Sequence, residues 1–78
     1  MPVKVQVNDR SGFPRPGVTV DIKWSSGFSS GRTDGNGIYD TGVDGNGDTI
    51  EYIKVYGEYV AGNRRTRSGE FITIQTNL

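Results

Sequence analysis

Two stretches of this chain alternate apolar and polar residues, and this alternation constrains the fold more than any other feature. The first stretch, PVKVQVND, places Val3, Val5 and Val7 on one face. The second, VTVDIKW, repeats the pattern from Val18 to Trp24. Because successive side chains of a β-strand point to opposite faces, each stretch predicts a strand with one buried face.

Shorter segments between turn-forming residues predict the remaining strands. They cover residues 37–42, 49–56, 58–61 and 70–76, with a break at Gly57. Twelve glycines and three prolines punctuate the chain, and no segment has the apolar spacing of an amphipathic helix. The pattern predicts an all-β fold, a small Greek-key-like sandwich of six or seven strands.

Two segments read as irregular. The Ser- and Gly-rich residues 25–31 predict a flexible connection in which Phe28 either covers the core or stands exposed, and residues 61–69 predict a polar turn. The inward phases of the strands predict the core, with Trp24 as its largest member. The expected core residues are Val5, Val7, Val18, Val20, Ile22, Trp24, Ile53, Val55, Ile72 and Ile74.

The length of 78 residues allows one domain, which we expect to span residues 1–78. No run approaches the roughly 20 apolar residues of a membrane-spanning helix, so we expect no membrane insertion. Nine basic and nine acidic residues cancel, so overall charge gives no attraction to nucleic acid.

The chain contains neither cysteine nor histidine. It therefore lacks thiolate nucleophiles, zinc-thiolate sites, disulfides and the usual general base near neutral pH. No catalytic triad or phosphate-binding loop is visible either, so we expect no enzymatic activity and no cofactor.

The compartment stays open from the sequence. No signal peptide is visible at the start of the chain. The chain is consistent with an intracellular product, with a virion component, or with an excised domain whose export signal lies upstream. A cell-surface, extracellular or virion location is favoured if it is an excised domain or a phage product.

Two motifs carry a resemblance to a known family. The first, D-x-x-G-x-P-x-PGV-x-V, begins at Asp9, and the second, T-D-x-x-G-x-Y, begins at Thr33. Together they resemble the carboxypeptidase regulatory-like domains, a branch of the transthyretin-like (prealbumin-like) β-sandwiches related to collagen-adhesin B-type repeats. The resemblance implies a sandwich without enzymatic activity, serving as a spacer, an accessory or a recognition module. The second DGNG and the connection 42–49 depart from the family pattern.

The tetrapeptide DGNG occurs twice, at residues 34–37 and 44–47. Asp44, Asn46 and Asp48 have the spacing of the first three ligands in an oxygen-only calcium loop, but Thr49 and Val55 then occupy positions that should be Gly and Glu. The alternative is two tight turns, since Asp, Asn and Gly favour turns. A third arrangement would bring the carboxylates together from different strands. Its members would be Asp34, Asp40, Asp44 and Asp48.

Aromatic residues suggest a ligand-binding surface. In the strand 49–56, Ile53 and Val55 are expected inward, which leaves Tyr52 and Tyr56 on the outer face in the same phase as Ile50. With Phe28 these side chains form a candidate surface for a polysaccharide or another ligand. The alternative is ordinary cross-strand aromatic packing.

A basic cluster of Arg64, Arg65 and Arg67 lies at an expected hairpin tip, and the sequence leaves open whether other arginines join it. Arginine binds phosphate, sulfate and carboxylate groups well. The cluster contains no stacking aromatic residue, so a solvated turn is favoured over nucleic-acid binding. The other candidate members are Arg10, Arg15 and Arg32.

We interpret the chain as a non-enzymatic structural or protein-interaction module of a surface, extracellular or virion assembly. The alternative is a module that binds carbohydrate or another ligand, with calcium as a candidate aid. The expected partner is a protein or a polysaccharide. Edge strands offer a route to oligomers.

Overall fold

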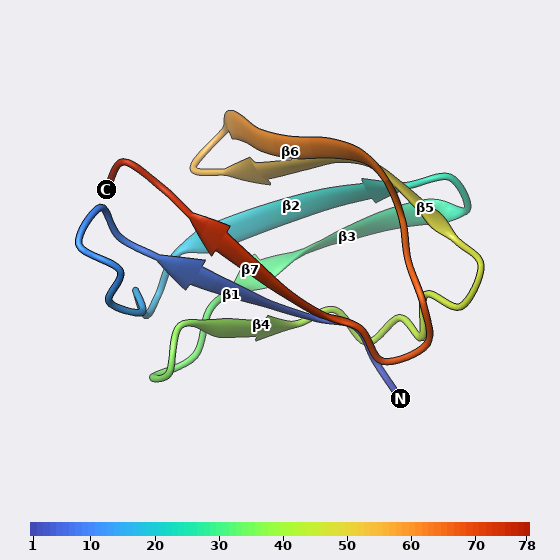
Figure 1. Cartoon of the computed structure of the whole chain (residues 1–78), viewed down its shortest axis with the longest axis horizontal. Helices are drawn as coiled ribbons and strands as arrows, with labels where there is room; N and C mark the ends of the chain where they lie inside the picture. The colour runs from blue at the N-terminus through green and yellow to red at the C-terminus, as the bar shows by residue number, and fades with distance from the viewer.

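Two β-sheets face each other across the core, as Figure 1 shows for the computed structural model of residues 1–78. One sheet has the strand order β4-β1-β7 and the other β3-β2-β5-β6. The predicted all-β sandwich is confirmed, with seven strands, and no helix is long and apolar enough to cross a membrane. The strands are β1 (Lys4–Asn8), β2 (Thr19–Trp24), β3 (Gly27–Arg32), β4 (Ile38–Asp40), β5 (Thr49–Val55), β6 (Glu58–Arg65) and β7 (Phe71–Gln75).

The central strands supply most of the core. β1 pairs antiparallel with β4 and parallel with β7, while β2 and β5 pair antiparallel in the middle of the other sheet. Every predicted core residue is buried. The core cluster has 13 members, and the three that were not predicted are Val3, Tyr39 and Ile50.

The prediction for Ile50 is wrong, because this side chain is fully buried rather than on the outer face with Tyr52. The register between β2 and β5 shifts where Lys23 pairs with Tyr52 and Trp24 pairs with Ile50. Glu51 is therefore an extra residue, as in a β-bulge. Since one inserted residue reverses the phase of a strand, the bulge turns Ile50 inward and leaves Tyr52 outward.

The segment predicted as flexible, residues 25–31, mostly forms a regular strand. β3 pairs residue by residue with β2, from Gly27 beside Trp24 to Arg32 beside Thr19. The prediction of a flexible connection is therefore wrong.

The small residues of β3 make room for two large aromatic side chains. The indole N–H of Trp24 donates to the hydroxyl of Ser29 at 3.0 Å, and both residues are buried. Nearby, a Cβ atom added at Gly31 would lie 2.5 Å from Cε1 of Tyr39. The Ser and Gly content of β3 thus reflects close packing.

β6 is longer than expected. It extends to Arg65, so the first part of segment 61–69, predicted as a polar turn, is strand. Tyr56 and Gly57 form the turn between β5 and β6 with φ values of 51° and 81°. Two central residues with positive φ are typical of a type I′ hairpin turn.

The same strand is irregular at two points. Its register against β5 shifts beyond Ile53, which leaves Val60 as an extra residue, and Asn63 has a φ of 45°. Such irregularities interrupt the even row of N–H and C=O groups on a free edge. The outer edge of β6 is therefore a poor template for another strand.

The second DGNG segment closes one end of the sandwich. Gly45 is buried, and a Cβ atom there would lie 2.6 Å from Cγ2 of Val3 and 3.4 Å from Cζ3 of Trp24. The buried Thr66 holds the loop, because its hydroxyl donates to the Gly45 carbonyl at 2.5 Å and its N–H to the Asp48 carbonyl at 2.8 Å. The loop between β4 and β5 thus covers the core at this end.

We expect Gly31→Ala to destabilise the protein by about 1–3 kcal/mol, because the new methyl group would overlap the Tyr39 ring. Gly27→Ala is the matched control in the same strand, since a Cβ there meets nothing within 4 Å. It should change stability by less than about 0.5 kcal/mol. Urea unfolding of both variants checks this, and equal losses would contradict the packing role of Gly31.

Tyr56→Asn should stabilise the protein by about 0.5–1 kcal/mol, because asparagine adopts a positive φ more readily than a bulky side chain does. Tyr59→Asn, at a position without a positive φ, is the control and should not stabilise. Thermal melting of the two variants measures the difference. A lower melting temperature for Tyr56→Asn would argue against strain at the turn.

Candidate functional site

The outer face of the four-stranded sheet carries a cluster of aromatic and basic side chains. The rings of Tyr52 on β5 and Tyr59 on β6 lie 5.3 Å apart, edge to face at 74°. The ammonium group of Lys54 lies 4.5 Å from the Tyr59 ring centre and 5.2 Å from that of Tyr52. Both contacts have the geometry of cation–π interactions.

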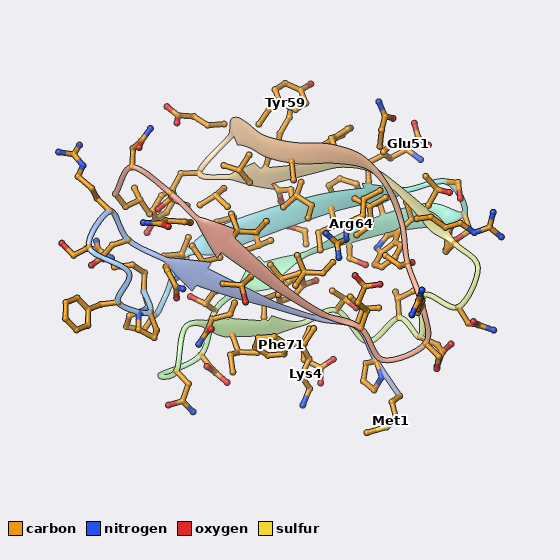
Figure 2. The ribbon with its side chains drawn as sticks, viewed as in Figure 1. Met1, Lys4, Glu51, Tyr59, Arg64 and Phe71 are labelled. Carbon is orange, nitrogen blue, oxygen red and sulfur yellow. The ribbon has the colours of Figure 1, made fainter.

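The cluster continues toward β3 through Lys23. Lys23 on β2 pairs with Phe28 on one side and with Tyr52 on the other. Its ammonium group lies 3.6 Å from the carboxylate of Glu51. Figure 2 shows Tyr59 and Glu51 at the top of the view, above the ribbons of β5 and β6. We call the set of Phe28, Lys23, Tyr52, Lys54 and Tyr59 the aromatic face.

Most of the aromatic surface on this face is open to solvent. Tyr59 is 70% exposed and Phe28 is 59% exposed, while Tyr52 is half-buried beneath its neighbours. Large exposed aromatic side chains that gather on one face are typical of interaction surfaces.

The sequence identified part of this surface. It placed Tyr52 outward and paired it with Tyr56, whereas the structure pairs Tyr52 with Tyr59. Tyr59 was missed, although the two-residue turn at Tyr56 and Gly57 would have predicted its position. Such a turn sets Val55 beside Glu58 and therefore Tyr59 beside Lys54.

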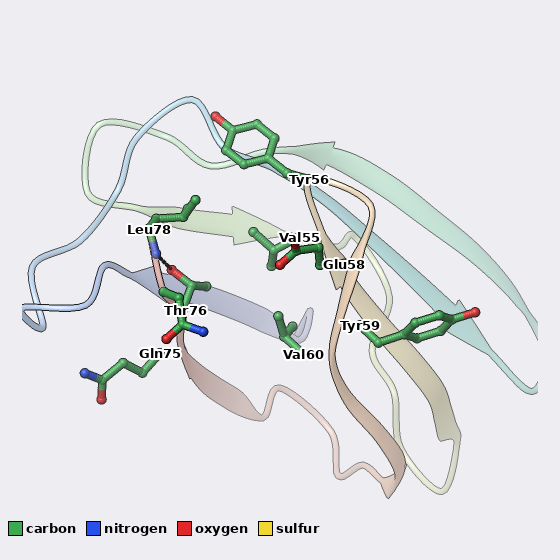
Figure 3. A pocket seen from close by; sticks show the side chains of 9 residues that line it. Val55, Tyr56, Glu58, Tyr59, Val60, Gln75, Thr76 and Leu78 are labelled. Atoms are coloured by element: carbon green, nitrogen blue, oxygen red, sulfur yellow. Dashed lines mark hydrogen bonds between the residues drawn. The ribbon is translucent and has the colours of Figure 1, made fainter.

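Tyr56 instead borders a hollow of about 450 Å³ between the β5–β6 turn and the residues that follow β7. In Figure 3, Leu78 and Thr76 lie on the left of this hollow and Val55 and Val60 face them, while Tyr56 stands above and the Tyr59 ring points away. The hollow is shared between the two sheets, since its lining comes from β5, β6 and the end of β7. The lining residues are Val55, Tyr56, Glu58, Tyr59, Val60, Gln75, Thr76, Asn77 and Leu78.

The first DGNG segment is a turn held by its own carboxylate. One Asp34 oxygen accepts N–H bonds from the residues two and four positions later, at 2.8 and 3.0 Å. Asp9 does the same in the loop after β1, at 2.9 and 3.0 Å. Both carboxylates are therefore used to shape the local backbone.

Serine hydroxyl groups donate hydrogen bonds to the carboxylates at the two ends of the second DGNG segment, Asp44 at its start and Asp48 directly after it. Asp44 accepts a hydrogen bond from the Ser68 hydroxyl at 2.6 Å. Asp48 accepts bonds from the Ser25 and Ser26 hydroxyls, both at 2.5 Å. These bonds join the loop between β4 and β5 to two other connections, the turn between β2 and β3 and the segment before β7.

The structure does not bring Asp34, Asp40, Asp44 and Asp48 together, because no group of three or more Asp, Glu, His or Cys side chains is placed to hold a metal ion. Calcium binding by Asp44, Asn46 and Asp48 stays a prediction. Any such ion would compete with the serine hydroxyls for the carboxylate oxygens.

The predicted basic cluster lies at the end of β6 and in the crossing to β7, which belongs to the other sheet, so the prediction of a hairpin tip is wrong. Arg64, Arg65 and Arg67 line a hollow of about 480 Å³ together with Ser68 and Glu70. The carboxylate of Glu70 forms an ion pair with the guanidinium of Arg64 and accepts the Arg67 N–H at 3.1 Å. Part of the positive charge is thus neutralised.

The other arginines do not join this cluster. β7 starts beside Lys4, so the crossing from β6 lies at the beginning of β1. Arg10 and Arg15 follow the end of β1, and Arg32 pairs with Thr19 at the start of β2. They therefore lie at the opposite end of the sandwich (Figure 1).

Three carboxyl groups make the stability of the folded protein depend on pH in the acid range. The Ser68 hydroxyl lowers the pKa of Asp44, the Ser25 hydroxyl that of Asp48, and the Arg64 guanidinium that of Glu70. A pKa that is lower in the folded state gives stability above the unfolded value, near 4, that is lost as pH falls through the folded value. We expect the melting temperature to fall as pH drops below about 4.

Asp48→Asn tests one of these groups, because it removes the charge that the serine hydroxyls stabilise. The variant should melt below the wild type at pH 7, and the difference should shrink between pH 7 and pH 2 as Asp48 takes up a proton. Ser26→Ala, which removes one donor, should reproduce part of the loss. A constant difference across this range would contradict the proton linkage.

The motif residues have clear structural roles. The Thr33 hydroxyl donates to the Arg15 carbonyl at 2.6 Å and accepts the Val18 N–H at 2.9 Å, which joins the two motifs.

No family model, curated protein or solved structure matches this chain. The resemblance to the carboxypeptidase regulatory-like domains therefore stays a prediction from Asp9, Thr33, Asp34 and their neighbours.

Proposed function

We propose that this protein is a non-enzymatic interaction module that binds a protein partner through the aromatic face. The observation that carries the proposal is the pair of Tyr59, which is exposed, and Tyr52, which is half-buried, with Lys54 against both rings. In protein interfaces, tyrosine is enriched among the residues that contribute most binding energy, and a polar rim surrounds them. Lys23 and Glu51 supply charged groups next to these rings.

The state of the carboxyl groups supports a non-enzymatic role. General acid catalysis near neutral pH calls for a raised carboxyl pKa. The three carboxyl groups with a clear shift, Asp44, Asp48 and Glu70, all have lowered pKa values caused by hydroxyl or guanidinium neighbours. Each of them ties one segment of the fold to another. Together with the lack of histidine and cysteine, this supports a structural role for these three carboxyl groups.

A polysaccharide is the second candidate partner. The Tyr59 ring is 70% exposed, and an exposed ring offers an apolar surface on which a sugar can stack. The same proposal includes the likeness to the transthyretin-like domains. It also includes a place in a surface, extracellular or virion assembly. Both candidates use the same side chains, so one set of variants tests them together.

The test replaces Tyr59 or Phe71 with a photo-crosslinking phenylalanine analogue in the source cells or particles. Phe71 is the control because it is an aromatic side chain, 51% exposed, on the outer face of the other sheet. We expect a protein crosslinked from position 59 and not from position 71. Identical products from both positions would contradict the assigned face.

The captured protein is then purified and titrated against the wild-type module and two variants, Tyr59→Ala and Phe71→Ala. Tyr59→Ala should weaken binding at least about tenfold, as expected for a central aromatic contact, and Phe71→Ala should leave affinity unchanged. Thermal melting confirms that both variants fold. Soluble polysaccharides are added separately to the isotope-labelled module, and amide shifts around Tyr52 and Tyr59 without a protein partner would favour the second candidate.

A further inference from the structure

Each sheet ends in two edge strands, and these differ in how well they could accept another strand. β4 is three residues long, and β6 carries the irregularities at Val60 and Asn63. Both features discourage pairing with a further strand. β3 and β7 are the regular edges, with six and five residues.

The free edge of β3 has a defined pattern of donors and acceptors. Trp24 and Gly27 flank a two-residue turn, so alternate residues of β3 exchange backbone hydrogen bonds with β2. Phe28, Ser30 and Arg32 are the residues between, and their N–H and C=O groups face away from β2. None of them takes part in the backbone hydrogen bonds outside the strands.

The side chains on this edge are complementary to a second copy of themselves. When β3 pairs antiparallel with another β3 and Ser30 lies on the two-fold axis, Phe28 of each copy faces Arg32 of the other. All three are exposed on the outer face. Three residue pairs then exchange edge hydrogen bonds, and an arginine lies beside a phenylalanine ring twice, as in a cation–π pair.

We propose that this chain forms a two-fold dimer through β3, with Phe28 opposite Arg32 and Ser30 on the axis. The inner face permits the approach, because Ser29 would face Gly31 and neither side chain is bulky. The pairing joins two four-stranded sheets into one continuous sheet of eight strands. The aromatic faces of both copies then lie on the same side, which suits a partner with repeated binding sites.

β7 fits a second copy less well. The same two-fold arrangement on β7 would place Phe71 opposite Gln75 and Thr73 on the axis, a register without a charged or cation–π pair. At its start, the neighbouring Glu70 is already paired with Arg64 of β6. The dimer therefore depends on β3, and although it uses Phe28 of the aromatic face, its test does not require the partner proposed above.

Sedimentation velocity from about 10 µM to about 1 mM tests the dimer, since a short edge interface is expected to be weak. We expect the mass to rise from that of a monomer of 8.5 kDa to that of a dimer. Amide signals of Phe28, Ser30 and Arg32 should shift with the same concentration dependence. A monomer at all concentrations overturns the proposal.

Charge substitutions at one position test the register. Phe28→Lys sets like charges opposite Arg32 and should raise the dissociation constant about tenfold or more, whereas Phe28→Glu sets opposite charges there and should preserve the dimer. Phe28 is exposed, so both variants should fold, which near-ultraviolet circular dichroism of Trp24 checks. Equal effects of the two substitutions overturn this register.

Thr73→Lys on β7 is the matched control. Thr73 occupies on β7 the central, exposed position that Ser30 occupies on β3. Ser30→Lys should weaken the dimer and Thr73→Lys should leave it unchanged. The reverse result, loss of the dimer with Thr73→Lys alone, overturns the assignment to β3.

Discussion

The burial of Trp24 is the interaction on which the rest of the structure depends. No disulfide joins the two sheets, so apolar burial holds them together, and a large aromatic residue buries about 150–250 Å². The indole bonds to Ser29, which draws β3 against the core, and lies beneath Gly45, which seats the loop between β4 and β5. One side chain thus fixes an edge strand and the closure of one end.

Alternation along the chain was enough to predict the centre of the fold. The valines of β1 and β2 were identified correctly because a regular strand keeps one phase. Ile50 and β3 were missed for two physical reasons. A bulge at Glu51 reverses the phase, and small residues such as Gly31 are required by the packing of Tyr39 from another strand. Tertiary packing decides both, and local composition does not record it.

The candidate site was predictable to the extent that local geometry decides it. Tyr52 was identified from the phase of its strand. Phe28 was identified because it is isolated among polar residues. Tyr59 required the pairing of β5 with β6, which follows from the conformation of the turn at Tyr56. The roles of Asp44 and Asp48 depend on serines from other connections, and no linear motif contains that information.

In the two loops held by Asp9 and Asp34, the residues that fix the loop conformation differ from the residues that form the exposed surface. Each carboxylate fixes its own loop from within, and the loops lie together, since a Cβ atom at Gly37 would come within 2.8 Å of Pro14. The residues between each Asp and the next Gly in the motif, positions 10–11 and 35–36, are exposed. This end of the sandwich can therefore diversify in sequence while the core stays unchanged, as the variable loops of antibody domains do.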